Sequence, residues 1–161
     1  MARIAELINE VYAVAEQGLW VDGAVRTSVD GVAGLTRDGE VAVAHLGDGV
    51  VGCVRVRRLD AATGEFGMLA VDPAHCGVGI GRELVRFAER TSRDAGLRAM
   101  RLELLVPKDW THPTKAFLAA WYTRLGYREV HTGRLDDDYP DLALMLATPC
   151  HLLAYEKALD P

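Results

Sequence analysis

The stretch MLAVDPAHCGVGIGRELV, residues 68–85, decides the fold of this chain. An apolar run ends at Asp72 and Pro73, glycines follow at positions 77, 79 and 81, and a helical period of apolar residues begins at Ile80. Glycine lets a backbone approach a ligand closely and adopt positive φ, and a helix start offers unpaired N–H groups at the positive end of its dipole. The stretch therefore predicts a strand, a glycine loop and a helix that form a cradle for a phosphate or diphosphate.

The glycine spacing excludes two common phosphate loops. A dinucleotide-binding GxGxxG loop needs glycine where the chain has Arg82, and a Walker P-loop needs Gly-Lys-Ser/Thr where it has Gly81, Arg82 and Glu83. One structural alternative stays open, in which the glycines only make a tight turn between strand and helix. Each glycine would then destabilise the helix start by up to about 1 kcal/mol with nothing to offset it.

The pattern around this stretch predicts a mixed α/β chain. Apolar residues at helical spacing predict helices over 4–16, over 28–37 with Ser28 as the cap, over 80–95 and over 113–125. Runs rich in β-branched residues predict strands over 40–46, 50–59, 65–71, 100–106, 127–133 and 150–157. We expect a turn at Thr63 and Gly64, a loop over the acidic residues 135–141, and a short helix over 142–147. Together these elements predict one domain over residues 1–161.

Composition narrows the class of protein. Half of the 161 residues are hydrophobic and a quarter are charged, which excludes a disordered, collagen-like or coiled-coil chain. The net charge of −5 argues against a nucleic-acid partner. Cys53, Cys76 and Cys150 form no CxxC pair, so neither a disulfide framework nor a zinc site is predicted. No apolar run reaches the roughly 18 residues of a membrane span, and we expect a soluble cytoplasmic protein with no membrane partner.

Two segments resemble a known family. MLAVDPAHCGVGIG resembles motif A of the GNAT superfamily of acetyl-CoA-dependent N-acetyltransferases, whose pattern is Arg/Gln-x-x-Gly-x-Gly/Ala after a strand that often ends Val-x-Pro. AAWYTRLGY, residues 119–127, resembles motif B, in which an aromatic pair precedes a Gly-aromatic corner. The resemblance spans about residues 40–155. It implies a GNAT-type α/β fold with a mixed, mostly antiparallel central sheet, helices on both faces and a splayed parallel strand pair.

The resemblance also implies a cofactor and the residues that bind it. Acetyl-CoA would be the acetyl donor, with its diphosphate on backbone N–H groups and its pantetheine arm paired with the preceding strand, and no metal is implied. The cofactor-binding residues would be Leu69, Val71, Cys76, Gly77, Val78, Gly79, Ile80, Gly81 and Arg82. The chain departs from the family at two positions. Cys76 replaces the Arg/Gln of motif A, and Lys115 stands where many members carry Asn.

Two residues are candidates for the chemistry. An alkylamine with a pKa near that of lysine, about 10.4, must lose a proton before it attacks a thioester, and the thiolate that leaves must gain one. By resemblance, Tyr122 would be the general acid and Glu65 the base of the histone-acetylating branch. Regular strand alternation would place Glu65 on the same face as Leu69 and Val71. The structural alternatives are that Tyr122 packs beside Trp121 and that Glu65 is a solvated charge.

Weaker candidates stay open in the same way. Trp110 and His112 either line an acceptor pocket or only begin a helix, and the aspartates at 136, 137, 138 and 141 either attract a cationic acceptor or are solvated. His75 and Cys76 are poorly placed for an acyl-cysteine route.

We therefore expect an N-acetyltransferase that passes acetyl directly from acetyl-CoA to a primary amine of a small molecule or peptide, and the family allows a homodimer. One alternative is a non-catalytic acyl-CoA sensor or interaction module on the same fold. Another is a different nucleotide-binding domain, which ATP or NAD rather than coenzyme A would stabilise against thermal unfolding.

Overall fold

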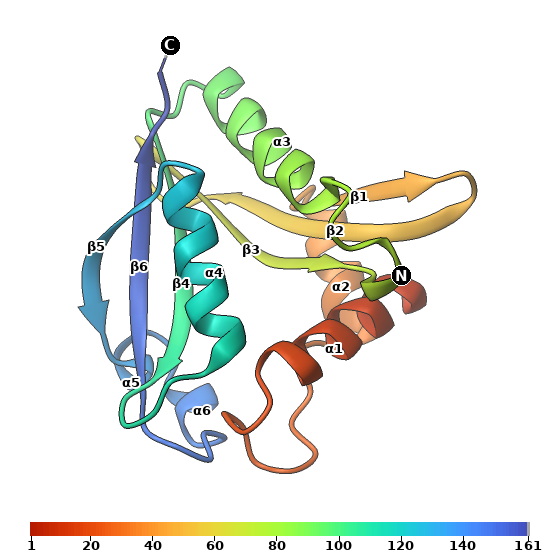
Figure 1. Ribbon diagram of the computed structural model, residues 1–161. Coiled ribbons are helices and arrows are strands. Elements are labelled where there is room, and N and C mark those ends of the chain that lie inside the picture. The colour runs from red at the N-terminus through yellow and green to blue at the C-terminus, as the bar shows by residue number, and fades with distance from the viewer. Residues whose placement is uncertain (161) are drawn as a thin grey trace. The chain divides into compact units, whose positions relative to one another are not determined.

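The computed structural model describes residues 1–160 (Figure 1). Its helices are α1 (Ala2–Ala15), α2 (Val29–Arg37), the 3-10 turn η1 (Pro73–His75), α3 (Ile80–Asp94), α4 (Pro113–Arg124), α5 (Leu135–Asp138) and α6 (Pro140–Ala143). Its strands are β1 (Val41–Leu46), β2 (Gly49–Arg58), β3 (Thr63–Val71), β4 (Ala99–Pro107), β5 (Arg128–Gly133) and β6 (Cys150–Ala158). Contacts divide the chain into two compact units, and each is described by itself. Unit 1 holds residues 1–13, 25–100 and those from 158 on, and unit 2 holds residues 14–24 and 101–157.

The predicted order of helices and strands is confirmed, and so is the mixed, mostly antiparallel α/β class. Strands follow one another as β1-β2-β3 in unit 1 and as β4-β6-β5 in unit 2. The pairs β1–β2, β2–β3 and β5–β6 are antiparallel. The predicted splay between two parallel strands depends on how the two units are placed, so it stays a prediction. The prediction that residues 1–161 form one domain also stays a prediction.

Helices cover both faces of the unit 1 strands (Figure 1). On one face, α1 and α2 pack over β2 and β3 in a core made of Ile4, Ala5, Leu7, Ile8, Val32, Cys53 and Ala70. On the other face lies α3, because a Cβ built on Gly52 of β2 would meet Leu84 Cδ1 at 3.0 Å and Ile80 Cγ2 at 3.1 Å. The glycine at this position therefore allows α3 to pack close to the sheet.

A bulge interrupts β3 two thirds of the way along the strand. Cys53 of β2 faces Ala70 and Arg55 faces Gly67, so one residue of β2 lies opposite two of β3. One of those two, Met68, has a φ of 48° and is the one non-glycine residue with positive φ within residues 1–160. The extra residue therefore changes which face the rest of the strand presents.

This bulge corrects the expected orientation of Glu65. A Cβ on Gly64 would meet Ser92 of α3, so Gly64 faces α3 and the next residue, Glu65, faces the other way. Val71 is in register with Gly52, which also faces α3. Glu65 and Val71 thus lie on opposite faces of β3, and the prediction that they share one is wrong because it assumed unbroken alternation.

The turn before β3 also lies elsewhere than predicted. Thr63 and Gly64 begin the strand, and the chain turns at residues 60–62. Asp60 Oδ1 accepts the N–H groups of Ala62 at 2.7 Å and Thr63 at 2.8 Å. The bond from Ala62 is the main reason why the pKa of Asp60 is lowered. The residue that makes the turn is therefore Asp60 and not Gly64, whose residue type suggested a turn.

Unit 2 closes around a core that residues 14–24 complete. Its buried members are Leu19, Leu105, Leu135, Cys150 and Leu152. Trp20 forms a strand-like bridge with Leu146, and Val21 N donates to Met145 O at 2.9 Å. The predicted helix over 142–147 is therefore wrong, since α6 ends at Ala143 and the chain then pairs with residues 19–21. Part of the predicted acidic loop is instead the single helical turn α5.

Candidate functional site

The predicted phosphate loop lies between β3 and α3 in unit 1. Gly77 and Gly79 have φ of 80° and 97°, a region that L side chains rarely adopt. Gly79 is the N-cap of α3 and supplies no side chain to cap it, and a Cβ built on either glycine would meet no atom within 4 Å. At these two positions the loop therefore presents its backbone with open space beside it.

The first turn of α3 leaves donors for a ligand. Its first helical hydrogen bond runs from Glu83 N to Gly79 O at 3.0 Å, so the N–H groups of Ile80, Gly81 and Arg82 precede it and have no acceptor within the helix. Arg82 itself is exposed. Converging N–H groups at the positive end of a 15-residue helix can bind a phosphate or diphosphate.

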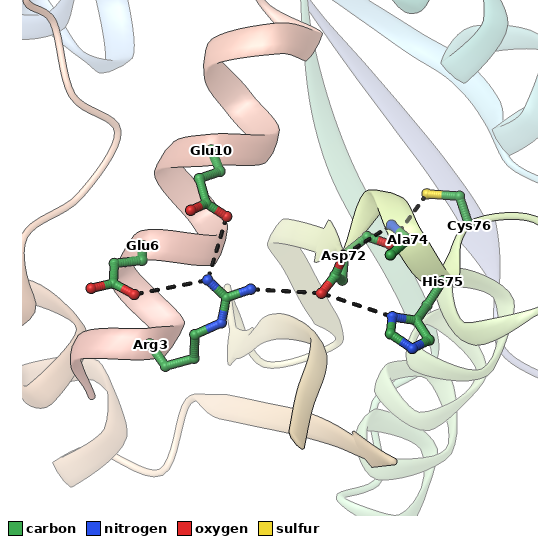
Figure 2. Close-up of polar contacts among 7 residues, drawn as sticks. All are labelled: Arg3, Glu6, Glu10, Asp72, Ala74, His75 and Cys76. Atoms are coloured by element: carbon green, nitrogen blue, oxygen red, sulfur yellow. Dashed lines mark hydrogen bonds and ion pairs between the residues drawn. The ribbon is translucent and has the colours of Figure 1, made fainter.

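Asp72 braces the base of this loop (Figure 2). Its Oδ1 accepts the N–H of Ala74 at 2.9 Å, which closes η1, and its Oδ2 lies 3.6 Å from Arg3 Nη2 of α1 and 3.8 Å from His75 Nδ1. The Cys76 thiol lies 3.6 Å from the Asp72 carbonyl oxygen. The loop is thus fixed to α1 within the same unit, and Cys76 offers no cation for a phosphate.

The charges around Arg3 have a net negative sum. Arg3 Nη1 lies 3.4 Å from Glu10 and 3.8 Å from Glu6, in addition to its contact with Asp72 (Figure 2). One guanidinium among three carboxylates has no spare positive charge for an anion. The backbone of the loop, with Arg82, is therefore the part of this region suited to phosphate. Leu69 and Val71, the predicted pantetheine partners, are half-buried and follow the bulge.

Glu65, the candidate base, lies in an ion pair in unit 1. Arg57 Nε donates to Glu65 Oε1 at 2.7 Å and Arg57 Nη2 lies 2.6 Å from the same oxygen. The Glu65 side chain is 12% exposed, so it is not a freely solvated charge. A base at this position would accept a proton while a guanidinium binds one of its oxygens.

Tyr122, the candidate acid, is fixed at the end of α4 in unit 2. The N–H of Tyr127 donates to Tyr122 O at 3.1 Å and that of Gly126, whose φ is 96°, donates to Thr123 O at 3.0 Å. This is the Schellman pattern that ends helices at a left-handed glycine. The rings of Tyr122 and Tyr127 meet edge to face with centroids 6.2 Å apart, and Trp121 lies 5.1 Å away. The motif fixes the backbone at Tyr122, and the ring is 6% exposed and packed against its two aromatic neighbours.

Sequence reasoning missed a buried ion pair at the other end of α4. Lys115 Nζ lies 2.7 Å from Glu16 Oε1, and both side chains are 5% exposed. Trp20 Nε1 donates to Glu16 Oε2 at 2.6 Å. Glu16 follows an amphipathic helix and is 99 positions away from its partner, so no local pattern distinguishes it from a solvated glutamate. The departure from the family at Lys115 was the one available signal.

The remaining candidates are also found in unit 2. His112 is 6% exposed, its Nε2 lies 3.1 Å from Gln17 O, and the Trp110 ring lies 5.4 Å away. His112 therefore packs in the interior as well as preceding the first residue of α4. Asp136 is bound by Arg134 at 2.6 Å, and that hydrogen bond is the main cause of its lowered pKa. Among the described residues, the buried Nδ1 of His112 has no hydrogen-bond partner.

Burial disfavours two of the three thiols as nucleophiles. Burial raises the pKa of Cys53 and that of Cys150 to about 11. Cys76 is exposed, and the hydrogen bond from its thiol to the Asp72 carbonyl oxygen is described above. Within residues 1–160 no three His, Cys, Asp or Glu side chains gather as metal ligands. None of the helices in that range is long and apolar enough to span a bilayer.

Comparison with known proteins identifies the family. A model described as "Acetyltransferase (GNAT) domain" matches residues 37–129, more than half of the chain. No curated protein matches the sequence. Solved structures are similar in fold. An aminoglycoside 6'-N-acetyltransferase complexed with coenzyme A is 15% identical with a TM-score of 0.72, covering 98% of this chain and 91% of that one.

Two further structures show the same fold at low identity. The protein yncA from Salmonella typhimurium with its cofactor acetyl-CoA is 21% identical, with a TM-score of 0.67 and coverage of 99% and 88%. N-acetylglutamate synthase from Neisseria gonorrhoeae, complexed with coenzyme A and N-acetyl-glutamate, is 18% identical with a TM-score of 0.67. It covers all of this chain, which spans only 33% of the synthase. The family resemblance predicted from motifs A and B is confirmed: the chain belongs to the GNAT family of acetyl-CoA-dependent acetyltransferases.

Proposed function

We propose that this protein transfers an acetyl group from acetyl-CoA directly to a primary amine of a small molecule or peptide. The observation that carries the proposal is the start of α3, where Gly77 and Gly79 have positive φ and open space beside them and the first-turn N–H groups have no helical acceptor. Residues 76–82 would bind the diphosphate of the cofactor, and Leu69 and Val71 its pantetheine arm.

Direct transfer is favoured over an acyl-cysteine route. Both buried thiols have raised pKa values, which disfavours the nucleophilic thiolate. In the proposed reaction the amine lone pair attacks the thioester carbonyl carbon, a C–N bond forms and the C–S bond breaks. Glu65 takes the proton of the amine, directly or through water, and Tyr122 gives its proton to the leaving thiolate.

The acceptor is proposed at the level of a primary amine. The aminoglycoside 6'-N-acetyltransferase and N-acetylglutamate synthase are both named for N-acetylation. The net charge of −5 favours a cationic acceptor over an acidic one. A cytoplasmic location and a homodimer stay predictions.

Calorimetry with coenzyme A and an assay of thiol release across a panel of amines test the proposal together. We expect one coenzyme A per chain and amine-dependent release of the thiol. Binding without release on any acceptor would replace the enzyme by an acyl-CoA-binding module. Protection against heat by ATP or NAD rather than by coenzyme A would indicate a different nucleotide-binding domain.

Tyr122→Phe tests the acid. General acid catalysis typically contributes about 100-fold or more, so we expect kcat to fall by at least that factor while coenzyme A still binds. Tyr127→Phe is the matched control, since it removes a hydroxyl from the neighbouring ring and should leave kcat unchanged. Full turnover in Tyr122→Phe would remove the role assigned to Tyr122.

Glu65→Gln tests the base. We expect the acidic limb of the pH–rate profile to disappear, because an amide cannot take up the proton. Glu40→Gln is the matched control: Glu40 forms a similar pair with Arg55 at 2.6 Å in the same unit, and the limb should persist there. An unchanged profile in Glu65→Gln would leave a water relay or another group as the base.

A further inference from the structure

The ion pair between Glu16 and Lys115 is unusual for its burial. Both side chains are 5% exposed, and the Glu16 carboxylate is bound at both oxygens, by Lys115 at 2.7 Å and by the Trp20 indole N–H at 2.6 Å. Side chains of this kind are rarely buried unless a partner offsets the loss of hydration. Apolar side chains at these two positions would avoid the cost of removing two charges from water, so stability alone does not explain the pair.

Lys115 is placed where a cation is unfavourable by itself. It is the third residue of α4, at the positive end of the helix dipole, so it opposes the dipole. The carboxylate of Glu16 compensates for both the dipole and the burial. The position of the first turn of α4 is thus coupled to Glu16, which directly follows α1 in sequence.

The inward face of α4 connects this pair to Tyr122. Lys115 and Tyr122 are the two buried residues of α4, and seven positions make about two helical turns, so both lie on one face. The Schellman motif with Gly126 fixes the far end of the helix beside Tyr122. A rigid helix fixed at both ends has a defined rotation about its axis, and this rotation sets the direction of the Tyr122 hydroxyl.

We propose that Glu16 and Lys115 are positioning residues for Tyr122. The proposal rests on the function proposed above, in which Tyr122 protonates the leaving thiolate. The pair holds the first turn of α4 in place and so orients the phenol for proton transfer. Loss of the pair lowers kcat without weakening the binding of coenzyme A, because the proposed diphosphate loop belongs to the other unit of the chain.

The test removes both charges at once. In Glu16→Gln/Lys115→Met the amide oxygen still accepts the Trp20 N–H and methionine fills the volume of the lysine stem, so no unpaired charge is left buried. We expect kcat per coenzyme A-binding molecule to fall at least tenfold, measured well below the thermal unfolding transition. The Kd for coenzyme A and the KM for acetyl-CoA should stay within twofold. Normalising by the calorimetric stoichiometry removes any effect of misfolded protein.

Two controls separate positioning from structural support. Glu40→Gln/Arg55→Met removes the Glu40–Arg55 ion pair of unit 1 and should leave kcat unchanged. Lys115→Arg keeps the charge and should retain most of the wild-type kcat. If the double variant does not fold, Glu16→Asp carries the test: it keeps both charges but shortens the carboxylate arm by one methylene, so the first turn of α4 must shift to keep the pair, and a fall in kcat with unchanged binding of coenzyme A is expected.

The outcomes are distinguishable from failure of the proposed function. If the wild type releases no thiol with any amine, the proposed function itself fails. If the wild type is active and Tyr122→Phe is impaired, but Glu16→Gln/Lys115→Met retains kcat within twofold, the pair is only structural and this inference is overturned.

Discussion

Helix α3 of unit 1 and helix α4 of unit 2 begin in opposite ways. Helix α3 starts at Gly79 with bare backbone, no side-chain cap and open space beside it. Helix α4 starts at Pro113, where the ring fits the first helical position, and two residues later it buries Lys115 against Glu16. The N-terminus of α3 is open to a ligand, whereas an ion pair between two side chains of the protein occupies the first turn of α4.

This difference indicates that the N-terminus of α3 is suited to bind a ligand and the N-terminus of α4 to hold a helix in position. The loop before α3, residues 76–79, holds no charged side chain, and Glu83 in the first turn pairs with Arg86 at 2.7 Å, so the N–H groups at this positive end remain open to an external anion. At α4 the charge of Lys115 is already matched by a carboxylate. Substitutions at the two helices and at the base of the loop test this contrast.

Lys115→Met alone should have the largest effect on stability. It leaves Glu16 buried without its cation, and breaking a buried pair on one side costs about 3–5 kcal/mol. Urea unfolding should show the loss as a lower midpoint. Glu16→Gln/Lys115→Met should regain most of it. Equal stability of the single and double variants would mean that the charge of Glu16 is compensated in another way.

Gly79→Ala should weaken the binding of coenzyme A about tenfold. A residue with a Cβ at φ 97° is strained by about 1–2 kcal/mol, so the loop would relax away from the geometry that aims its N–H groups. Gly39→Ala is the matched control, since Gly39 has a φ of 76° and open space but lies outside the loop. Calorimetry should show weaker binding only in the first variant, and equal Kd values would refute the assignment of the loop.

Gly126→Ala should lower stability by about 1 kcal/mol, because alanine is strained at φ 96°. The added Cβ would lie 3.4 Å from Lys157 Cε, which is the flexible end of a side chain and can move. Thermal unfolding measures the loss. A neutral result would show that the Schellman motif contributes little to fixing α4, and the position of Tyr122 would then depend more on the Glu16–Lys115 pair.

Arg3→Ala should have the smallest effect, about 0.2–1 kcal/mol. The Arg3 side chain is 44% exposed, and exposed ion pairs are weak and screened by salt. Urea unfolding at low and high ionic strength should show a difference from the wild type that shrinks as salt is added. A salt-independent loss above 1 kcal/mol would mean that the contact with Asp72 stabilises the loop base more strongly than exposure suggests.

Local signals predicted the order of the elements well. Ser28 caps α2 as its sequence suggests, since its side chain accepts the N–H of Gly31, and Gly126 ends α4 in the left-handed region. The glycine loop before Ile80 was also recognisable, because the combination of a buried strand, glycines and an amphipathic helix is confined to one short segment.

Features that depend on distant partners were not predictable. Nothing near Glu16 in sequence indicates Lys115 as its partner. Residues 142–147 have a helical pattern, yet backbone pairing with residues 19–21 takes precedence over it. In each case a contact between segments far apart in sequence overrides the local preference.

The bulge at Met68 makes the length of β3 as important as its composition. Gly64 and Val71 are an odd number of positions apart, so regular alternation would place them on opposite faces, and the extra residue at the bulge is what lets both face α3. A one-residue deletion between them keeps both residues facing α3 only if the bulge is lost with it, whereas a one-residue insertion that keeps the bulge turns one of them away. Insertions in this segment should therefore be selected against even where every individual side chain can be exchanged.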